Sequence, residues 1–136
     1  MQITSRLTRA GMLGAAAVAA LAFSAAPASA APVVTVSPST GLSDGQSVTV
    51  AGNGYTAGAE VAVAQCSGGD KCVSTATTAK VGADGRFTTG YTVRKTFTAT
   101  DWSTGSTVSV DCAVQQCQLV AYTEVTGSVG TNISFG

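Results

Sequence analysis

The chain has 136 residues, of which 45% are hydrophobic and 10% are charged, and its seven basic residues balance its seven acidic ones. It contains no histidine, so the side chain that most often acts as a general base near neutral pH is absent. Without a basic excess, the chain has little attraction for phosphate backbones, which argues against direct, tight nucleic-acid binding.

Residues 1–30 have the organisation of a secretory signal peptide. Arg6 and Arg9 provide the positive start, residues 11–23 form an apolar run, and Ala-Ser-Ala at 28–30 is a small-residue cleavage site. The apolar run is shorter than the roughly 20 residues that cross a bilayer, which disfavours a retained membrane anchor. We therefore expect a secreted, extracellular protein without stable membrane association.

Removal of this leader leaves residues 31–136, a length that suits one domain with a core of limited depth. The loss of Arg6 and Arg9 leaves five basic and seven acidic side chains, so the net charge of the mature chain is five minus seven, or −2. A weakly acidic domain of this kind further weakens the case for a nucleic-acid partner.

Short runs that alternate apolar and polar residues recur along the mature chain, and no window has apolar residues at helical spacing. In chain order, the expected strands are 34–36, 47–50, 60–64, 87–93, 106–110, 119–125 and 133–135. The turn signals between them are 43–45, 52–54, 68–70, 83–85 and 126–127. Seven or eight short strands with this spacing predict an all-β fold, an antiparallel β-sandwich.

The alternation also assigns one face of each strand to the core. The expected core members are Val48, Val50, Val61, Val63, Val108, Val110, Ile133 and Phe135. Pro38 interrupts the first run and has no N–H to donate, so we expect that run to lie at a sheet edge or to split there.

Four cysteines form two close pairs, each spanning a short loop between expected strands. An oxidising compartment lets them pair, and four cysteines allow three connectivities. Proximity in sequence favours the disulfides Cys66–Cys72 and Cys112–Cys117. The alternative is a four-cysteine metal site, although the five- and four-residue gaps are wider than in most zinc knuckles and no histidine can help.

The residues that would carry catalysis are missing or isolated. No serine or threonine has a recognisable activating partner, and no glycine-rich loop leads into a helix. We expect Asp44 and Asp84 to bond the backbone of their own turns, and Asp111 either to accept backbone N–H bonds in its loop or to be solvated. A binding module is therefore favoured over an enzyme, a secreted hydrolase included, and no catalytic residue is expected.

Several motifs point to one family. Ser37-Pro38 precedes Gly-Leu-Ser-Asp-Gly at 41–45. The other motifs are Ala-Gln-Cys at 64–66, Thr-Val-Arg-Lys-Thr-Phe at 92–97, Val-Asp-Cys at 110–112, Cys-Gln at 117–118 and Ile-Ser-Phe-Gly at 133–136. Their order and the cysteine placement resemble the neocarzinostatin family, the apoproteins of chromoprotein antitumour antibiotics from actinomycetes. The resemblance covers essentially all of residues 31–136.

This resemblance implies a seven-stranded, immunoglobulin-like antiparallel β-sandwich with a small two-stranded ribbon and the two local disulfides. A cleft between sandwich and ribbon would hold an enediyne chromophore non-covalently, with no required cofactor. The protein would be a monomeric carrier and stabiliser, and the released chromophore would damage DNA as an antitumour and antibacterial agent. The alternative is a secreted binding or cell-envelope module of the same family that binds no enediyne.

Three of the ligand-binding positions that the resemblance implies are aromatic residues. Trp102, the single tryptophan, lies in an expected loop where the family has an aromatic residue packed on the chromophore; loop packing is the alternative. Phe97 is expected either in the core or at the cleft rim. Tyr122 replaces a small polar residue of the family pattern on the strand after Cys117.

The other implied positions adjoin cysteines or the same strand. Gln65 and Gln118 match cleft-floor positions, where an amide offers both a donor and an acceptor to a ligand. Their alternative role is to satisfy strand-edge backbone groups. Leu119 is the remaining candidate.

The chain also departs from the family pattern in two places. The loop between the first two cysteines, residues 67–71, is shorter and less apolar than in well-studied members, where it forms one wall of the cleft. Thr77 occupies a position that is aromatic in the family. Both departures predict a shallower and more polar cleft.

Overall fold

Ten antiparallel strands organise residues 31–136, the part of the chain that the computed structural model describes. The expected signal peptide, residues 1–30, lies outside the described residues. The strands are β1 (Val33–Ser37), β2 (Ser47–Asn53), β3 (Glu60–Ser67), β4 (Lys71–Cys72), β5 (Thr77–Lys80), β6 (Phe87–Thr92), β7 (Thr96–Asp101), β8 (Thr107–Asp111), β9 (Cys117–Thr123) and β10 (Gly127–Ile133). No helix occurs in residues 31–136, so no described helix is long and apolar enough to cross a membrane.

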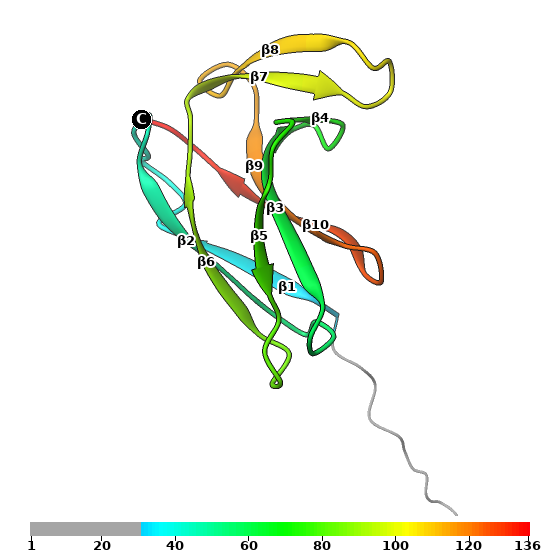
Figure 1. The fold of residues 1–136 in the computed structure, drawn as a ribbon. Helices are drawn as coiled ribbons and strands as arrows, with labels where there is room; N and C mark the ends of the chain where they lie inside the picture. The colour runs from blue at the N-terminus through cyan, green and yellow to red at the C-terminus, as the bar shows by residue number, and fades with distance from the viewer. Residues whose placement is uncertain (1–30) are drawn as a thin grey trace, which may run out of the picture. The chain divides into compact units, whose positions relative to one another are not determined.

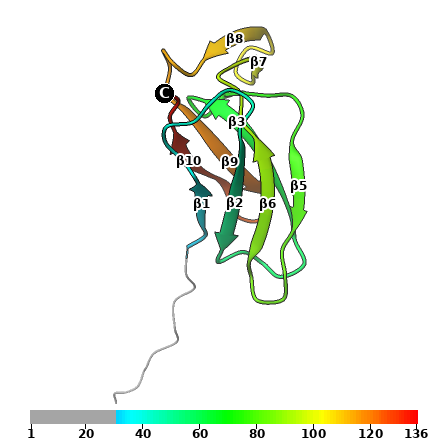
Figure 2. The same ribbon diagram turned by 90° about the vertical axis from the view of Figure 1, so that its left-hand side faces the viewer.

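The strands form two sheets (Figures 1 and 2). The first sheet has the order β1-β2-β6, and the second has the order β10-β9-β3-β4-β7-β8, with β5 also paired to β3. Seven of these strands, β1, β2 and β6 facing β5, β3, β9 and β10, make up the sandwich. The hairpin of β7 and β8, here called the ribbon, joins the second sheet through the short strand β4. This arrangement confirms the predicted all-β sandwich with a two-stranded ribbon.

The core lies between the two sheets and is built from alternate residues of each strand. Of the eight expected core members, Val108 and Phe135 are only partly buried and pack against the core, whereas the other six are buried. β1 lies at the edge of the first sheet and ends directly before Pro38, as predicted. The alternation rule therefore identifies the buried face correctly wherever one side of a strand faces the other sheet.

The last strand differs from the prediction. β10 begins at Gly127 and ends at Ile133, whereas the sequence predicts a strand only at 133–135. Its residues pair one by one with β9, from Gly127 opposite Thr123 to Ile133 opposite Cys117. The strand exists because its backbone completes the hydrogen-bond ladder of β9, and its polar side chains give no apolar alternation to detect.

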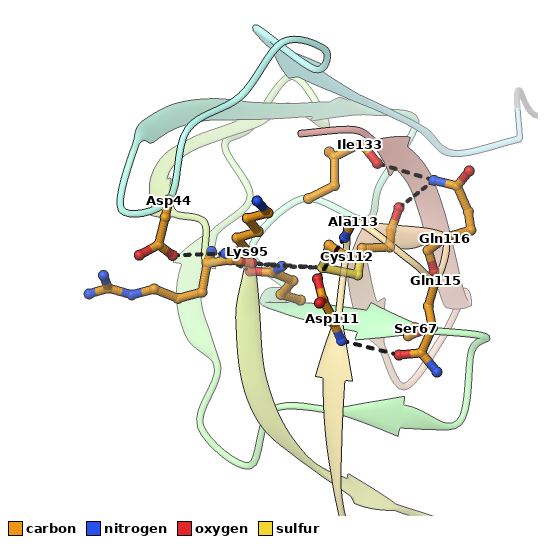
Figure 3. The surroundings of a disulfide bond; sticks show 12 residues. Asp44, Ser67, Lys95, Asp111, Cys112, Ala113, Gln115, Gln116 and Ile133 are labelled. Carbon is orange, nitrogen blue, oxygen red and sulfur yellow. Dashed lines mark hydrogen bonds between the residues drawn. A yellow bond between two sulfur atoms is a disulfide. The ribbon is translucent and has the colours of Figure 1, made fainter. Parts of the chain in front are cut away.

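Both predicted disulfides are present, and the four cysteines of the described chain are all paired. Near the second disulfide, Asp111 Oδ1 accepts a hydrogen bond from the Ala113 N–H at 2.9 Å, as expected of a loop-orienting carboxylate (Figure 3). Asp84 Oδ1 likewise accepts from the Arg86 N–H at 3.2 Å within its own turn.

Asp44 departs from the predicted local role. Its Oδ1 accepts from the Lys95 N–H at 2.8 Å, across 51 residues of sequence, and so ties the turn before β2 to the start of β7 (Figure 3). Turn chemistry alone does not predict this bond, because the partner comes close only in the folded chain.

Candidate functional site

A cleft of about 600 Å³ lies on the second sheet, on the side of β3 and β9 that faces away from the core. The alternation of β3 explains its position, since Val61 and Val63 point into the core and Ala62 and Ala64 point out. The floor of the cleft consists of Ala62, Ala64, Cys66, Val120, Tyr122 and Ser128. The wall consists of Gly69, Cys72, Val73, Ser74, Ala76 and Trp102.

The depth of the cleft follows from small side chains in register across three strands. Tyr122 of β9 stands opposite Ala62 of β3 on one side and opposite Ser128 of β10 on the other. The next row places Val120 between Ala64 and a glycine of β10. Because alanine, serine and glycine rise little above the sheet, this region of the outer face remains open.

The wall forms where β3 changes its pairing partner. Along β3, β5 pairs with Glu60–Val63, whereas β4 pairs with Cys66 and Ser67. The segment between β4 and β5 runs alongside this gap, and the Val73 N–H donates to the Gln65 carbonyl at 3.0 Å. The cleft wall is therefore a loop held to the sheet by a backbone bond and by the Cys66–Cys72 disulfide.

Trp102 reaches the cleft from the turn that follows β7. The backbone N–H of Trp102 donates to the Asp70 carbonyl at 2.8 Å, and this bond joins the turn to the loop between β3 and β4. Asp101 Oδ1 accepts from the N–H of Ser103 at 3.0 Å and from its Oγ at 2.6 Å. The indole is 66% exposed, so it contributes to the cleft while still facing solvent, and its loop position agrees with the prediction.

Charge is confined to the rim of the cleft. Lys71 Nζ lies 3.3 Å from Asp70 Oδ1 and 4.0 Å from Asp101 Oδ2, beside the Trp102 turn. The Ser103 hydroxyl and N–H hydrogen bonds, aided by Lys71, lower the pKa of Asp101 below its ordinary value. None of the residues that form the floor and wall is charged.

Of the six residues predicted from the sequence, the structure brings Trp102 and Tyr122 together in the cleft lining. Gln118 stands on the same outward face of β9, opposite Cys66. Its side chain lies over Gly130, where a Cβ atom would collide with the Gln118 amide. Gln118 therefore borders the floor without being part of the lining.

The other three side chains lie away from the cleft. Leu119 is fully buried in the core, because it lies three positions before Tyr122 on the strand and the two side chains therefore point to opposite faces. Gln65 is 1% exposed; its Nε2 donates to the Arg94 carbonyl at 2.7 Å and its Oε1 accepts from the Arg94 N–H at 2.9 Å. Phe97 packs against the core from the ribbon and lines a separate, open hollow there.

Sequence reasoning missed most of the lining. The outward direction of Ala62 and Ala64 follows from the alternation with Val61 and Val63, so a signal for them exists. No comparable signal exists for Ser128, because its strand was not predicted, or for the wall from Val73 to Ala76, which has no regular structure. Thr77, which occupies a position that is aromatic in the family, does not line the cleft.

The chemistry of this site suits binding better than bond breaking. Its lining offers apolar side chains, two aromatic rings and the hydroxyls of Ser74, Ser128 and Tyr122. The lining is mostly apolar. Within residues 31–136, no group of three or more His, Cys, Asp or Glu side chains is placed to hold a metal ion.

The fold and the site define a class of disulfide-linked antiparallel β-sandwich that carries an uncharged cleft beside a two-stranded ribbon, and the cleft has the size of a small-molecule site. Residues 34–135 match the Neocarzinostatin family, and the chain belongs to that family.

Its relatives include named antibiotic proteins of Streptomyces. The chain is 40% identical over 128 residues to the "Antitumor antibiotic C-1027 apoprotein" of Streptomyces globisporus, covering 89% of this chain and 90% of the relative. It is 39% identical to actinoxanthin of the same organism, with the same coverage. It is 42% identical over 132 residues to macromomycin of Streptomyces macromomyceticus, covering 86% of each chain.

Solved structures show the same fold. Macromomycin superposes with a TM-score of 0.70 at 33% identity, covering 78% of this chain and all of that one. The solution conformation of apokedarcidin superposes with a TM-score of 0.62 at 32% identity, covering 79% of this chain and all of that one.

Proposed function

We propose that this protein is a carrier that binds an apolar, enediyne-type chromophore non-covalently in the cleft. The observation that carries this proposal is a mostly apolar cleft of about 600 Å³ flanked by Trp102 and Tyr122. A recess of this size, with few polar groups, is typical of sites for small organic ligands. Because hydrogen-bonded strands form the floor, binding costs little ordering of the protein.

Family membership supports the same class of ligand, since the Neocarzinostatin family is that of chromoprotein antibiotic apoproteins. In this proposal the cleft shields an unstable guest from water and thiols, and the guest damages DNA after its release. The protein would act outside the cell as a monomer, with an antitumour and antibacterial effect that belongs to the chromophore.

The carrier role also explains which reactive groups the chain lacks. It has no histidine, and the cysteines are all paired in disulfides, so the domain presents neither an imidazole nor a thiol to a reactive ligand. We accordingly propose that the protein is not an enzyme. A hydrolytic activity that survives repurification and disappears with one point substitution would contradict this part of the proposal.

The test is a titration of the disulfide-bonded domain, residues 31–136, with acridone, a neutral tricyclic aromatic compound. Stacking of the guest against Trp102 is expected to quench the emission of this single tryptophan in a saturable way. Ala64→Phe places a ring on the cleft floor and should weaken binding at least about tenfold, because it fills the space that the guest needs.

A matched control is Val114→Phe, which adds a ring of the same kind at an exposed turn away from the cleft. It should leave the affinity unchanged. Two negative results together would favour the alternative, a family module that binds no enediyne. These results are that acridone does not bind and that methanol extracts no aromatic ligand from the protein secreted by the producing culture.

A further inference from the structure

The Cys66–Cys72 disulfide is part of the surface of the proposed ligand cleft. Cys66 belongs to the floor and Cys72 to the wall. Cys66 is only 1% exposed, whereas Cys72 is half-buried, so we expect a reagent that enters the cleft to reach Cys72 before Cys66. The same cavity that would hold the ligand therefore gives access to a redox-active bond.

This disulfide fixes the connection between the second sheet and the ribbon. β4 has two residues; it pairs with Cys66 and Ser67 on one side and with Thr100 and Asp101 on the other. So short a strand contributes few backbone hydrogen bonds of its own. The covalent bond between β3 and β4 is consequently a main restraint on the place where the ribbon joins the sheet.

The loop enclosed by the disulfide also positions Trp102. Its Asp70 carbonyl accepts the Trp102 N–H at 2.8 Å, and the neighbouring Lys71 lies 4.0 Å from the Asp101 carboxylate. Gly68 and Gly69 have φ angles of 73° and 88°, a region that glycine enters easily and leaves easily. Without the disulfide this loop would gain many conformations, and the Trp102 turn would lose its fixed support.

The second disulfide has a different environment. Cys117 is fully buried and Cys112 is 9% exposed, and both belong to the hydrophobic core. Gln65 Nε2 lies 3.3 Å from Cys112 Sγ inside the protein. Because neither of its cysteines lines the cleft and both lie in the core, we expect a thiol to reduce this disulfide more slowly than Cys66–Cys72.

We propose that reduction of Cys66–Cys72 opens the cleft, and that a bound ligand in turn protects this disulfide from reduction. The protection rests on the proposed carrier function. If the oxidised protein binds the ligand more tightly than the reduced protein, the bound ligand must shift the redox equilibrium toward the oxidised form by the same factor.

The reductant is a dithiol. One of its thiolates attacks the Cys72 sulfur, the S–S bond breaks, and Cys66 leaves as a thiolate that takes up a proton. The second thiol of the reductant then displaces the Cys72 thiolate, which is also protonated. The dithiol loses two electrons and two protons and becomes a cyclic disulfide, while each cysteine gains one electron and one proton.

The first experiment needs no ligand. The oxidised domain is treated with dithiothreitol, and samples are alkylated with iodoacetamide and mapped by mass spectrometry. Cys66 and Cys72 should be labelled at least about tenfold faster than Cys112 and Cys117, because only their disulfide borders the cleft. Trp102 emission should change in the same step while the far-ultraviolet circular dichroism persists. Equal rates, or loss of both disulfides together with the circular dichroism, would overturn the inference.

The second experiment measures the coupling with acridone as the probe. Selectively reduced protein should bind it at least about tenfold more weakly, and saturating acridone should slow labelling of Cys66 and Cys72 but not that of Cys112 and Cys117. Unchanged affinity after reduction would overturn the inference and leave the carrier function intact. If acridone fails to bind the oxidised protein, the carrier proposal is contradicted. The order of cysteine labelling and the change in Trp102 emission then still decide whether reduction of Cys66–Cys72 loosens the cleft wall.

Paired variants provide the control. Cys66→Ala/Cys72→Ala should bind acridone weakly, and Cys112→Ala/Cys117→Ala should bind it normally provided that its circular dichroism is native. Because either pair can impair folding, reduction of the unaltered protein remains the deciding measurement. Tight binding by a folded Cys66→Ala/Cys72→Ala variant would contradict the proposal.

Discussion

Gln65 illustrates how one buried polar side chain can join distant segments of this small domain. Its amide makes a donor and an acceptor bond to the backbone of Arg94, in the connection between β6 and β7. Its own N–H donates to the Tyr91 hydroxyl at 3.0 Å. A side chain that the family resemblance places among the ligand contacts thus bonds, in this fold, to the backbone of the connection between β6 and β7.

We predict that Gln65→Leu destabilises the domain by about 2 kcal/mol, since it removes both hydrogen bonds between the Gln65 amide and the Arg94 backbone. Urea unfolding followed by circular dichroism measures the change. The control is Gln115→Leu at an exposed turn, where the loss should be below about 1 kcal/mol. Equal effects of the two substitutions would show that the Gln65–Arg94 bonds contribute little.

Tyr55 presents the opposite case, a buried hydroxyl that has no hydrogen-bond partner among the described residues. The ring itself is well packed, with its centroid 5.3 Å from that of Phe87 at an edge-on angle of 74°. We predict that Tyr55→Phe keeps this packing and raises the stability by up to about 1 kcal/mol, because it removes a desolvated polar group.

The same residue predicts a pH effect. Burial raises the pKa of Tyr55 above its ordinary 10.0, because the folded state favours the neutral phenol. Ionisation of Tyr55 therefore costs the domain no stability below pH 10.0, and stability is lost as the pH rises through the folded-state pKa. Tyr55→Phe should therefore unfold less readily in alkali than the unaltered protein. A destabilised variant with unchanged alkaline sensitivity would mean that the hydroxyl has a partner after all.

At the scale of an element, the turn after β7 decides where Trp102 stands. Asp101 holds the turn through Ser103, and its pKa is lowered chiefly by the Ser103 side-chain hydrogen bond. For a carboxylate with a depressed folded-state pKa, the stabilisation is complete above the ordinary value of 3.8 and is lost as the pH falls through the lower value. The turn should therefore remain ordered at pH 3.8 and loosen only in stronger acid.

Trp102 emission and anisotropy, followed during acidification, measure this transition. Ser103→Ala removes the main cause of the lowered pKa and should move the midpoint to higher pH. Asp101→Asn, which does not ionise, should abolish the step. A midpoint that is the same in Ser103→Ala would assign the transition to another carboxylate.

The elements also differ in how far the sequence determines them. Strands with one apolar face, such as the run from Val61 to Val63 in β3, are predictable because the alternation records which side is buried. The alternation does not predict β4, β5, β7 or β10, since these strands follow from pairing with their neighbours rather than from their own side chains. The cleft wall is equally hard to predict, because it has no regular structure. Trp102 and Tyr122 could be named in advance from the family resemblance, which also named Phe97, a residue that lies away from the cleft.

At the scale of the whole molecule, side-chain and backbone bonds close the sandwich along its β1 and β10 edges. Thr131 Oγ1 of β10 donates to the Val34 carbonyl of β1 at 2.6 Å, across 97 residues of sequence. Nearby, the chain after β10 returns to the first sheet, where the Leu42 N–H donates to the Ser134 carbonyl at 3.1 Å. These bonds join the end of the chain, in and after β10, to β1 and the loop that follows it, and so limit how far the two sheets can separate.

We predict that Thr131→Val lowers the stability of the whole domain by about 1 kcal/mol, because it keeps the side-chain shape but leaves the Val34 carbonyl without this donor. Urea unfolding should show a lower midpoint with an unchanged slope, since the same surface is exposed on unfolding. Thr88→Val, on the exposed face of β6, is the matched control and should change the midpoint little. A lower slope in Thr131→Val would instead indicate that the two sheets no longer unfold as one cooperative unit, and would make this edge bond a determinant of cooperativity rather than of stability alone.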